Sequence, residues 1–391
     1  MTPCTPADPT IKIGVVAVTG ENSSSNNATH FAVNPRTGTT NYGWTPILLS
    51  TLKSLGVTPD FLIHHVYPEW TDPNNPAASP DNDARLLAST GNWAADAPDL
   101  RQQLTDYLGA AGTNVELLCT ENNSDAGAQG RQSTSIVNGL YLADSLAQLM
   151  KTEFNGFIWW DLRNGTDTGG YFGSNVYGWR SFGDLGVING LNTRLPVFYA
   201  FKLMQYFARP GDMVLNSTSD YPPLSTYAAR KADGSLAVLV INKDNATAFA
   251  AQFALTSYLP WTNVFVRSFG LIQDEATRTN STIPGAQDIA TNFLAIAGTN
   301  LTTMFPPYSV TLLTIPPAAP KLAVLSSGNG QFCFQVQGQA DVRYVLQTSA
   351  GLSGGGWTAV ATNTPPGGIW NVTNSPASPQ KFWRAVWLPL N

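Results

Sequence analysis

A carboxylate flanked by amide side chains is the feature of this sequence that most directly suggests chemistry. Glu121 follows the apolar stretch Leu117–Cys119 within LLCTENN, and Asn122 and Asn123 come directly after it. A carboxylate held at the end of a strand can attack an anomeric carbon while neighbouring amides bind sugar hydroxyls. An ordinary loop glutamate would show the same local pattern, so the flanking segments must decide between the two interpretations.

Two aromatic-rich segments flank this glutamate in the sequence. Upstream, IHHVYPEW carries His65 and Tyr67 at alternate strand positions, which share one face. Either side chain could hydrogen-bond a neighbouring carboxylate, and packing in the core is the alternative. Downstream, GFIWWDLRNG carries Trp159 and Trp160, whose flat apolar rings could stack on a sugar. We expect one of these two tryptophans to serve only in core packing.

The cysteines and histidines do not suggest a metal site. Cys4, Cys119 and Cys333 are widely scattered, with no pair at metal-ligand spacing, and the 3 histidines are not expected to build a three-histidine zinc site by themselves. We therefore expect free thiols, with Cys119 buried in an apolar strand. The predicted mechanism uses no metal and no cofactor.

Alternating strands and helices are predicted to position these residues. The continuous apolar run at 11–18 is typical of a strand buried on both faces of a parallel sheet. Further strands are expected at 61–66, 115–120 and 156–160, and helices at 44–55, 100–110, 133–150 and 196–207. Four such units imply a parallel sheet with right-handed crossovers, which is half of an eight-unit TIM-type barrel.

Long loops follow the predicted strands, at 19–42, 67–96, 121–132 and 161–194. In βα barrels the loops at the carboxyl ends of the strands carry the active site. The placement of the extra chain length on one edge of the sheet therefore favours a functional site there.

The second half of the sequence changes to short alternating segments separated by turn residues. Strands are expected at 224–230, 236–241, 249–255, 263–269 and 308–314, and they predict an antiparallel β-sandwich. A Pro-rich linker at 315–320 leads to a small all-β module. The predicted fold class is thus α/β plus all-β, with domains at 1–210, 211–317 and 318–391.

Composition narrows the class of ligand. Charged residues make up 12% of the sequence and the net charge is −5, without a basic run, which argues against nucleic acid. No apolar run is long enough for a membrane helix. A surface rich in neutral polar groups, with 11 Trp, 13 Tyr and 18 Phe in the chain, suits a neutral, hydroxylated ligand.

Together, HHVYPEW, CTENN and GFIWWDLRNG resemble the sixth, seventh and eighth strands of the retaining glycosidases built on a βα barrel. The arabinofuranosidase, xylosidase and endoglucanase-like branches are the most similar, and DPTIKIGVV is similar to their fifth strand. The resemblance implies Glu121 as nucleophile, His65 or Tyr67 as its hydrogen-bond partner, and Trp159 or Trp160 as sugar platform, with Asn122 beside the substrate. It also implies a β-sandwich after the barrel, and residues 321–391 look like a C-terminal module of secreted bacterial polysaccharide-degrading proteins.

The general acid/base departs from the family pattern. In the family it ends the fourth strand, and this sequence begins at about the fifth. Glu21 and Glu69 are the internal candidates, and no family motif supports either. The predicted function is a retaining glycoside hydrolase acting on plant cell-wall polysaccharide of the cellulose or hemicellulose class. A non-catalytic carbohydrate-binding protein or an inactive fragment is the alternative, and a purely structural surface protein is disfavoured.

Two further expectations concern the partner and the location of the protein. The open sheet should be covered by a partner, either a second copy in a homodimer or the missing half of the barrel. The protein is expected to be secreted or periplasmic in a bacterium, with the export signal encoded upstream, because the opening Met-Thr-Pro-Cys-Thr is too polar to serve as one.

Overall fold

The computed structural model describes residues 8, 10–25, 29–278, 285–296, 298–352, 356–375 and 381–388. The chain divides into two compact units, Met1–Phe201 with Asp274–Gln287 and Lys202–Gln273 with Asp288–Asn391. The domain limits expected at 210 and 317 stay predictions.

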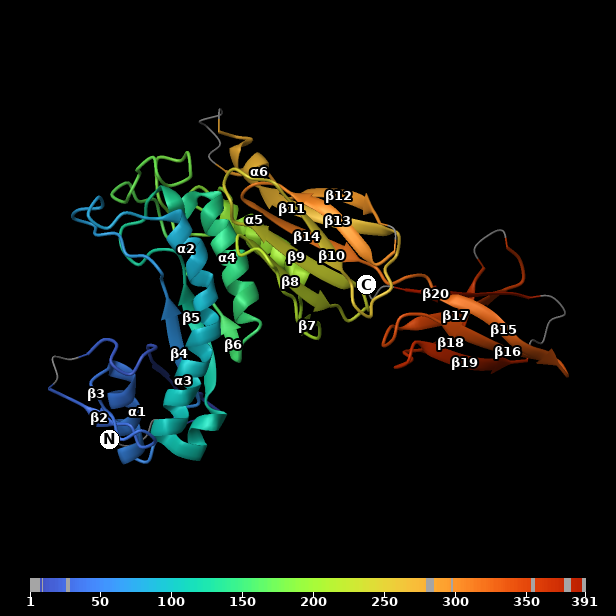
Figure 1. Cartoon of the computed structure of the whole chain (residues 1–391), viewed down its shortest axis with the longest axis horizontal. Coiled ribbons are helices and arrows are strands. Elements are labelled where there is room, and N and C mark those ends of the chain that lie inside the picture. The colour runs from blue at the N-terminus through green and yellow to red at the C-terminus, as the bar shows by residue number, and fades with distance from the viewer. Residues whose placement is uncertain are drawn as a thin grey trace. The chain divides into compact units, whose positions relative to one another are not determined.

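A four-stranded parallel sheet organises the first unit (Figure 1). Its strands lie in the order β1 (Gly14–Val16), β4 (Phe61–Val66), β5 (Glu116–Asn122) and β6 (Phe154–Phe157), and every neighbouring pair is parallel. Sequence order and spatial order agree, as expected for consecutive βα units. The predicted parallel sheet is confirmed, and it fits part of a barrel.

Strand ends differ from the predictions in ways that matter for the site. β5 runs two residues further than predicted and includes Glu121 and Asn122. β6 ends at Phe157, before both tryptophans. The chain beyond it still follows β5, because the Ile158 amide donates to the Cys119 carbonyl (2.8 Å) and the Trp160 amide to the Asn122 carbonyl (3.1 Å).

The predicted helices are present, and α2 was missed among them. The helices are α1 (Trp44–Ser54), α2 (Asp83–Ser89), α3 (Trp93–Leu108), α4 (Ile136–Leu149) and α5 (Pro196–Phe207). α4 begins later than predicted because Ser135 caps it, its side chain accepting from the Val137 amide. α2 and a small hairpin of β2 (Ala32–Val33) and β3 (Thr40–Asn41) lie inside predicted loops, where short elements leave little periodic signal.

The core of the first unit lies between the parallel sheet and its helices. Leu62 and Leu117 of the sheet pack with Leu100 and Leu104 of α3, and all four are fully buried. Cys119 is buried in the same core with a free thiol, as predicted. Cys333 is also free, and Cys4 lies outside the described residues.

Antiparallel sheets build the second unit. Six strands pair in the order β12 (Ala290–Ala295), β11 (Asn263–Gly270), β14 (Ser309–Ile315), β9 (Leu236–Asn242), β8 (Leu224–Arg230) and β7 (Met213–Leu215). β10 (Phe249–Ala254) pairs with β13 (Asn300–Phe305) in a second, two-stranded sheet. Side chains of both sheets, among them Val240, Leu313 and Phe305, share one core. α6 (Leu271–Glu275), β12 and β13 were not predicted.

The regular elements described within residues 321–391 are all strands, as expected of the predicted all-β module. They pair as β15 (Lys321–Gly328), β16 (Gln331–Gln337) and β19 (Ile369–Asn374), and as β18 (Thr358–Asn363), β17 (Tyr344–Ser349) and β20 (Phe382–Trp387). In the described residues, no helix combines the length and hydropathy needed to cross a membrane. The same residues contain no group of three or more His, Cys, Asp or Glu side chains arranged to hold a metal ion.

Candidate active site

Glu121, Tyr67 and His65 meet at the carboxyl ends of two neighbouring strands. The Tyr67 hydroxyl donates to Oε2 of Glu121 at 2.9 Å, and Nδ1 of His65 lies 3.5 Å from the same oxygen. Both residues named from the sequence as possible partners therefore contact the glutamate. The three residues come from chain segments 54 or more residues apart and are joined by the parallel pairing of β4 and β5.

An irregularity in β5 aims the glutamate. Pairing shifts from His64 opposite Cys119 to His65 opposite Glu121, so β5 contains one extra residue, Thr120, at this point. Such bulges re-aim side chains and are common beside active sites. His65 consequently reaches both residues, with Nε2 lying 2.9 Å from the Thr120 hydroxyl.

This arrangement leaves the carboxylate accessible and hydrogen-bonded. The Glu121 side chain is 29% exposed and that of His65 is 33% exposed. Burial, and then the bond to Glu121, raise the pKa of the Tyr67 hydroxyl far above its ordinary value, so Tyr67 stays protonated and remains a donor. An accessible carboxylate with a permanent donor on one oxygen can act as a nucleophile through the other.

The two asparagines after Glu121 are fully buried. The Asn122 amide donates to the Val66 carbonyl (2.9 Å) and to the Tyr141 hydroxyl (2.7 Å), which joins β4, β5 and α4. A sugar contact through Asn122 stays a prediction, and its side chain already has partners inside the fold. Asn123 was not singled out from the sequence as a site residue.

Asn123 links Glu121 to the tryptophan segment. Its amide nitrogen donates to the carbonyl of Trp160 and to that of Leu185 (3.0 Å), and its oxygen accepts from the Asn138 amide (3.1 Å). A buried, fully bonded amide of this kind fixes the backbone that it contacts. Asn123 therefore holds the chain at Trp160 beside the end of β5.

The two tryptophans have different environments. Trp159 is 7% exposed, and its ring lies 6.1 Å from that of Tyr141 and 6.2 Å from that of Phe201. Trp160 is 43% exposed. The expectation that one of the pair serves in core packing fits Trp159, which leaves Trp160 as the candidate platform.

Glu21 belongs to a separate hydrogen-bond network. Its Oε1 accepts from the Asn34 amide at 2.6 Å and from the Tyr107 hydroxyl at 2.8 Å. Neither partner belongs to the group around Glu121. A role for Glu21 as general acid stays a prediction, without support from these contacts.

Glu69 lies two residues beyond Tyr67, in a cluster of buried carboxyls. Its side chain is 1% exposed and accepts from Nε of Arg85 at 2.8 Å. Burial raises its pKa to about 7, against the opposing effect of Arg85. A proton donor needs such a pKa, but it also needs access to the substrate, which a fully buried side chain lacks.

Asp161 is a further carboxyl at this edge that sequence reasoning did not select. It follows Trp160 directly, burial raises its pKa, and its charge contributes to the raised pKa of Tyr67. Its Oδ1 is buried and has no hydrogen-bond partner within the described part of the chain. The available signal was its place in WWD just after a predicted strand, which is weak by itself.

Comparisons with known proteins bear on the fold. No protein-family model and no curated protein matches the chain. A solved structure of a thermostable α-L-arabinofuranosidase from Thermotoga petrophila matches at 15% identity with a TM-score of 0.52, covering 80% of this chain and 59% of that one. The α-L-arabinofuranosidase from Thermotoga maritima in its arabinose complex matches at 16% identity and 0.50, covering 79% and 58%. A monomeric β-xylosidase from Caulobacter crescentus matches at 15% and 0.50, covering 80% and 62%.

The fold is that of the barrel-type glycoside hydrolases. The resemblance seen in the three sequence motifs is thus confirmed at the level of fold. The chain spans about three fifths of the length of these structures, 58% to 62%. The four-stranded parallel sheet fits a part of such a barrel.

Proposed function

We propose that this protein is a glycoside hydrolase that uses Glu121 as the nucleophile of a retaining mechanism. The observation that carries the proposal is the 2.9 Å hydrogen bond from Tyr67 to Glu121, with His65 beside the same oxygen, at the carboxyl ends of adjacent parallel strands. The fold supports it, because βα-barrel enzymes place their catalytic groups at this edge.

In the first step, the free oxygen of Glu121 attacks the anomeric carbon and the glycosidic C–O bond breaks. The departing oxygen takes a proton from a general acid, and a covalent glycosyl–enzyme remains. In the second step, water loses a proton to the same acid/base group and displaces Glu121, which restores the carboxylate. Tyr67 and His65 orient the Glu121 carboxylate in both steps.

The general acid must lie about 5–5.5 Å from the nucleophile. Within the described residues, Tyr67 and His65 contact the Glu121 carboxylate directly. We propose that neither Glu21 nor Glu69 is this acid, because Glu21 is hydrogen-bonded to Asn34 and Tyr107 and the Glu69 side chain is 1% exposed.

The proposed substrate is a neutral polysaccharide of the plant cell wall, of the hemicellulose or cellulose class. Trp160 offers an exposed ring, and its backbone amide donates to the carbonyl of Asn122, the residue after the nucleophile, so the ring is a candidate platform for the apolar face of a sugar. The structural neighbours include enzymes named for arabinofuranosides and xylosides, so these two sugars are the first candidates.

Aryl glycosides test the proposal, because a good leaving group needs little help from an acid. We expect the chain to hydrolyse an aryl arabinofuranoside, xyloside or glucoside, and Glu121→Gln to lower kcat by orders of magnitude. Glu116→Gln, an exposed position at the other end of β5, is the matched control. Near-normal turnover by Glu121→Gln would contradict the assignment.

A non-catalytic carbohydrate-binding protein is the second candidate. The observation in its favour is that Glu21 and Glu69, the two internal candidates for the acid, are held by other side chains. Binding of xylan or arabinan fragments without turnover of any aryl glycoside would establish this alternative.

A further inference from the structure

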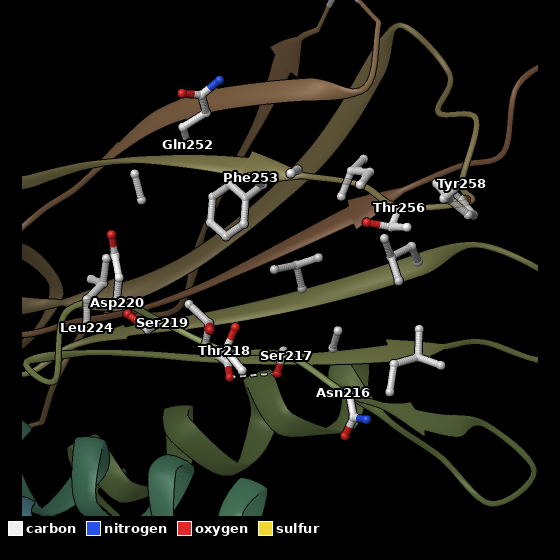
Figure 2. Close-up of a pocket in the computed structure, with 18 of the residues that line it drawn as sticks. Asn216, Ser217, Thr218, Ser219, Asp220, Leu224, Gln252, Phe253, Thr256 and Tyr258 are labelled. Carbon is white, nitrogen blue, oxygen red and sulfur yellow. Dashed lines mark hydrogen bonds between the residues drawn. The ribbon is translucent and has the colours of Figure 1, made fainter.

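A large groove lies in the second unit, away from Glu121 in the chain (Figure 2). Its volume is about 1140 Å³, and all of its lining residues belong to that unit. One wall is β10 with the segment that follows it, and the other is the segment that follows β7. Figure 2 shows Phe253 and Thr256 on the first wall and Asn216–Asp220 on the second.

The rim of the groove is polar and nearly uncharged. Four consecutive hydroxyl or amide residues, Asn216–Ser219, line one wall, and Thr256 and Gln339 contribute from elsewhere. Asp220 and Arg230 are the charged residues of the lining, and Arg230 is paired with Asp341 (Nη1 to Oδ2, 3.4 Å). Such a rim can exchange hydrogen bonds with neutral hydroxyls, and it offers little to an anionic or cationic ligand.

The floor and one end of the groove are apolar. Leu224 and Val238 line the floor, and Phe253 adds an apolar ring from the β10 wall. Tyr221 is 42% exposed, and its ring lies 4.8 Å from that of Phe249, so the two rings form a tilted pair at the groove. An apolar surface with an exposed aromatic ring, bordered by a few converging polar groups, is the usual composition of a ligand site.

One buried hydroxyl in the lining lacks a partner. Oγ1 of Thr226 is buried and makes no hydrogen bond within the described residues. The carbonyl of the same residue accepts from the Ser217 hydroxyl of the rim at 2.8 Å. A buried polar atom without a partner is costly unless water or a ligand completes it.

We propose that this groove is a second binding site, which takes a segment of a neutral oligosaccharide. A pyranose or furanose ring presents apolar C–H faces and neutral hydroxyls, which match the Tyr221 ring, the apolar floor and the hydroxyl and amide rim. The groove shares no residue with the Glu121 site. It would hold a polysaccharide independently of cleavage, so the inference goes beyond the proposed function.

An extended peptide is the competing occupant. β10 pairs with β13 alone among the described strands, so one edge of β10 is open to strand addition. The uncharged Asn216–Ser219 run and the exposed Tyr221 favour a sugar, because strand addition uses backbone groups and does not require either feature.

The test uses the full chain carrying Glu121→Gln, so that substrate is not consumed. Binding of xylohexaose, cellohexaose and arabinohexaose is measured by calorimetry in this Glu121→Gln protein. The measurement is repeated after Tyr221→Ala or Tyr221→Phe is added to it. We expect at least one of the three to bind, Tyr221→Ala to weaken that binding at least tenfold, and Tyr221→Phe to retain it. Trp261→Ala, an equally exposed aromatic of the same unit outside the groove, should bind normally.

The outcomes separate this inference from the proposed function. With Glu121 intact, the Tyr221→Ala variant should hydrolyse aryl glycosides at an unchanged rate. If the parent protein fails to hydrolyse them, the proposed function is contradicted, and the inference about the groove still rests on its own binding test. Absence of oligosaccharide binding, or equal binding by a folded Tyr221→Ala variant, would overturn the inference. Tyr221-dependent binding of an alternating Thr–Val octapeptide without sugar binding would overturn it in favour of strand addition.

Discussion

At the scale of single residues, the hydrogen bond from Tyr67 is the contact that distinguishes Glu121 from an ordinary strand-end glutamate. Tyr67→Phe removes the donor at 2.9 Å and keeps the ring, so the fold should be preserved. We expect kcat on an aryl glycoside to fall by roughly 10- to 100-fold, because the carboxylate is no longer oriented. Steady-state kinetics with circular dichroism checks this, and an unchanged kcat would show that His65 alone is sufficient.

The two adjacent tryptophans should respond differently to truncation. Trp160→Ala removes an exposed ring and should weaken substrate binding by about 1–3 kcal/mol, without loss of stability. Trp159→Ala leaves a cavity among buried aromatic rings and should lower the free energy of unfolding by about 3–5 kcal/mol. Urea unfolding and inhibition by a bound sugar measure the two effects. The reverse pattern would exchange the two roles.

At the scale of elements, buried carboxyls join the chain after β4 to the chain after β5. The Thr71 hydroxyl lies 2.7 Å from Asp81 and 2.6 Å from Asp125. One hydroxyl proton cannot serve both carboxylates, so the arrangement favours a proton held on a carboxyl. Burial accordingly raises the pKa of Asp81 well above its usual range, and that of Glu69 to about 7.

These raised pKa values predict that the fold loses stability at alkaline pH. A carboxyl whose pKa is higher in the folded than in the unfolded state binds more protons when folded, so its contribution is present in acid and is lost as the pH rises through the folded pKa. We expect Tm to fall by about 5 °C between pH 5.5 and pH 9. Asp81→Asn should flatten this dependence in differential scanning calorimetry. A Tm that rises over the same range would contradict the assignment.

At the scale of the whole molecule, β1 and β6 are the edge strands of the parallel sheet, and each has one strand partner within the described part of the chain. Apolar side chains are exposed near β1, at Ile11, Ile13 and Val16, and beyond β6, at Ile158 and Leu162. Exposed apolar edges promote association unless they are covered. We propose that a partner covers these edges. When the chain is purified by itself, this partner is a second copy of the chain.

Light scattering at micromolar concentration tests this proposal. We expect the mass of a dimer, because an isologous pair buries the same patch on both copies. Ile11→Lys, near the β1 edge and outside the three site motifs, should shift the equilibrium toward monomer, whereas Leu191→Lys, an exposed apolar loop position, should not. A stable monomer at all concentrations would show that the edges are tolerated uncovered.

The local sequence pattern was sufficient to predict the parallel sheet and the order in which the site residues follow its strands. The strand at 61–66 and the helix at 196–207 match the predictions in full, since their apolar periodicity is continuous and their ends carry clear signals. The same reasoning placed Glu121 at a strand end, between the segment carrying His65 and Tyr67 and the segment carrying Trp159 and Trp160. The α3 helix, by contrast, begins seven residues before its predicted start and contains Pro98, a residue that is unfavourable inside a helix.

The tertiary structure decided which side chains are buried and which partners they bind. The adjacent residues Trp159 and Trp160 are alike in sequence, and only the packing of Tyr141 and Phe201 makes one of them buried. Asn122 has the sequence context of a ligand contact, yet its amide binds partners from β4 and α4. The Asp81–Thr71–Asp125 cluster and the groove beside β10 likewise join segments far apart in the chain. A single sequence records which side chains are available, whereas exposure and hydrogen bonding depend on contacts between distant segments, which form only when the chain folds.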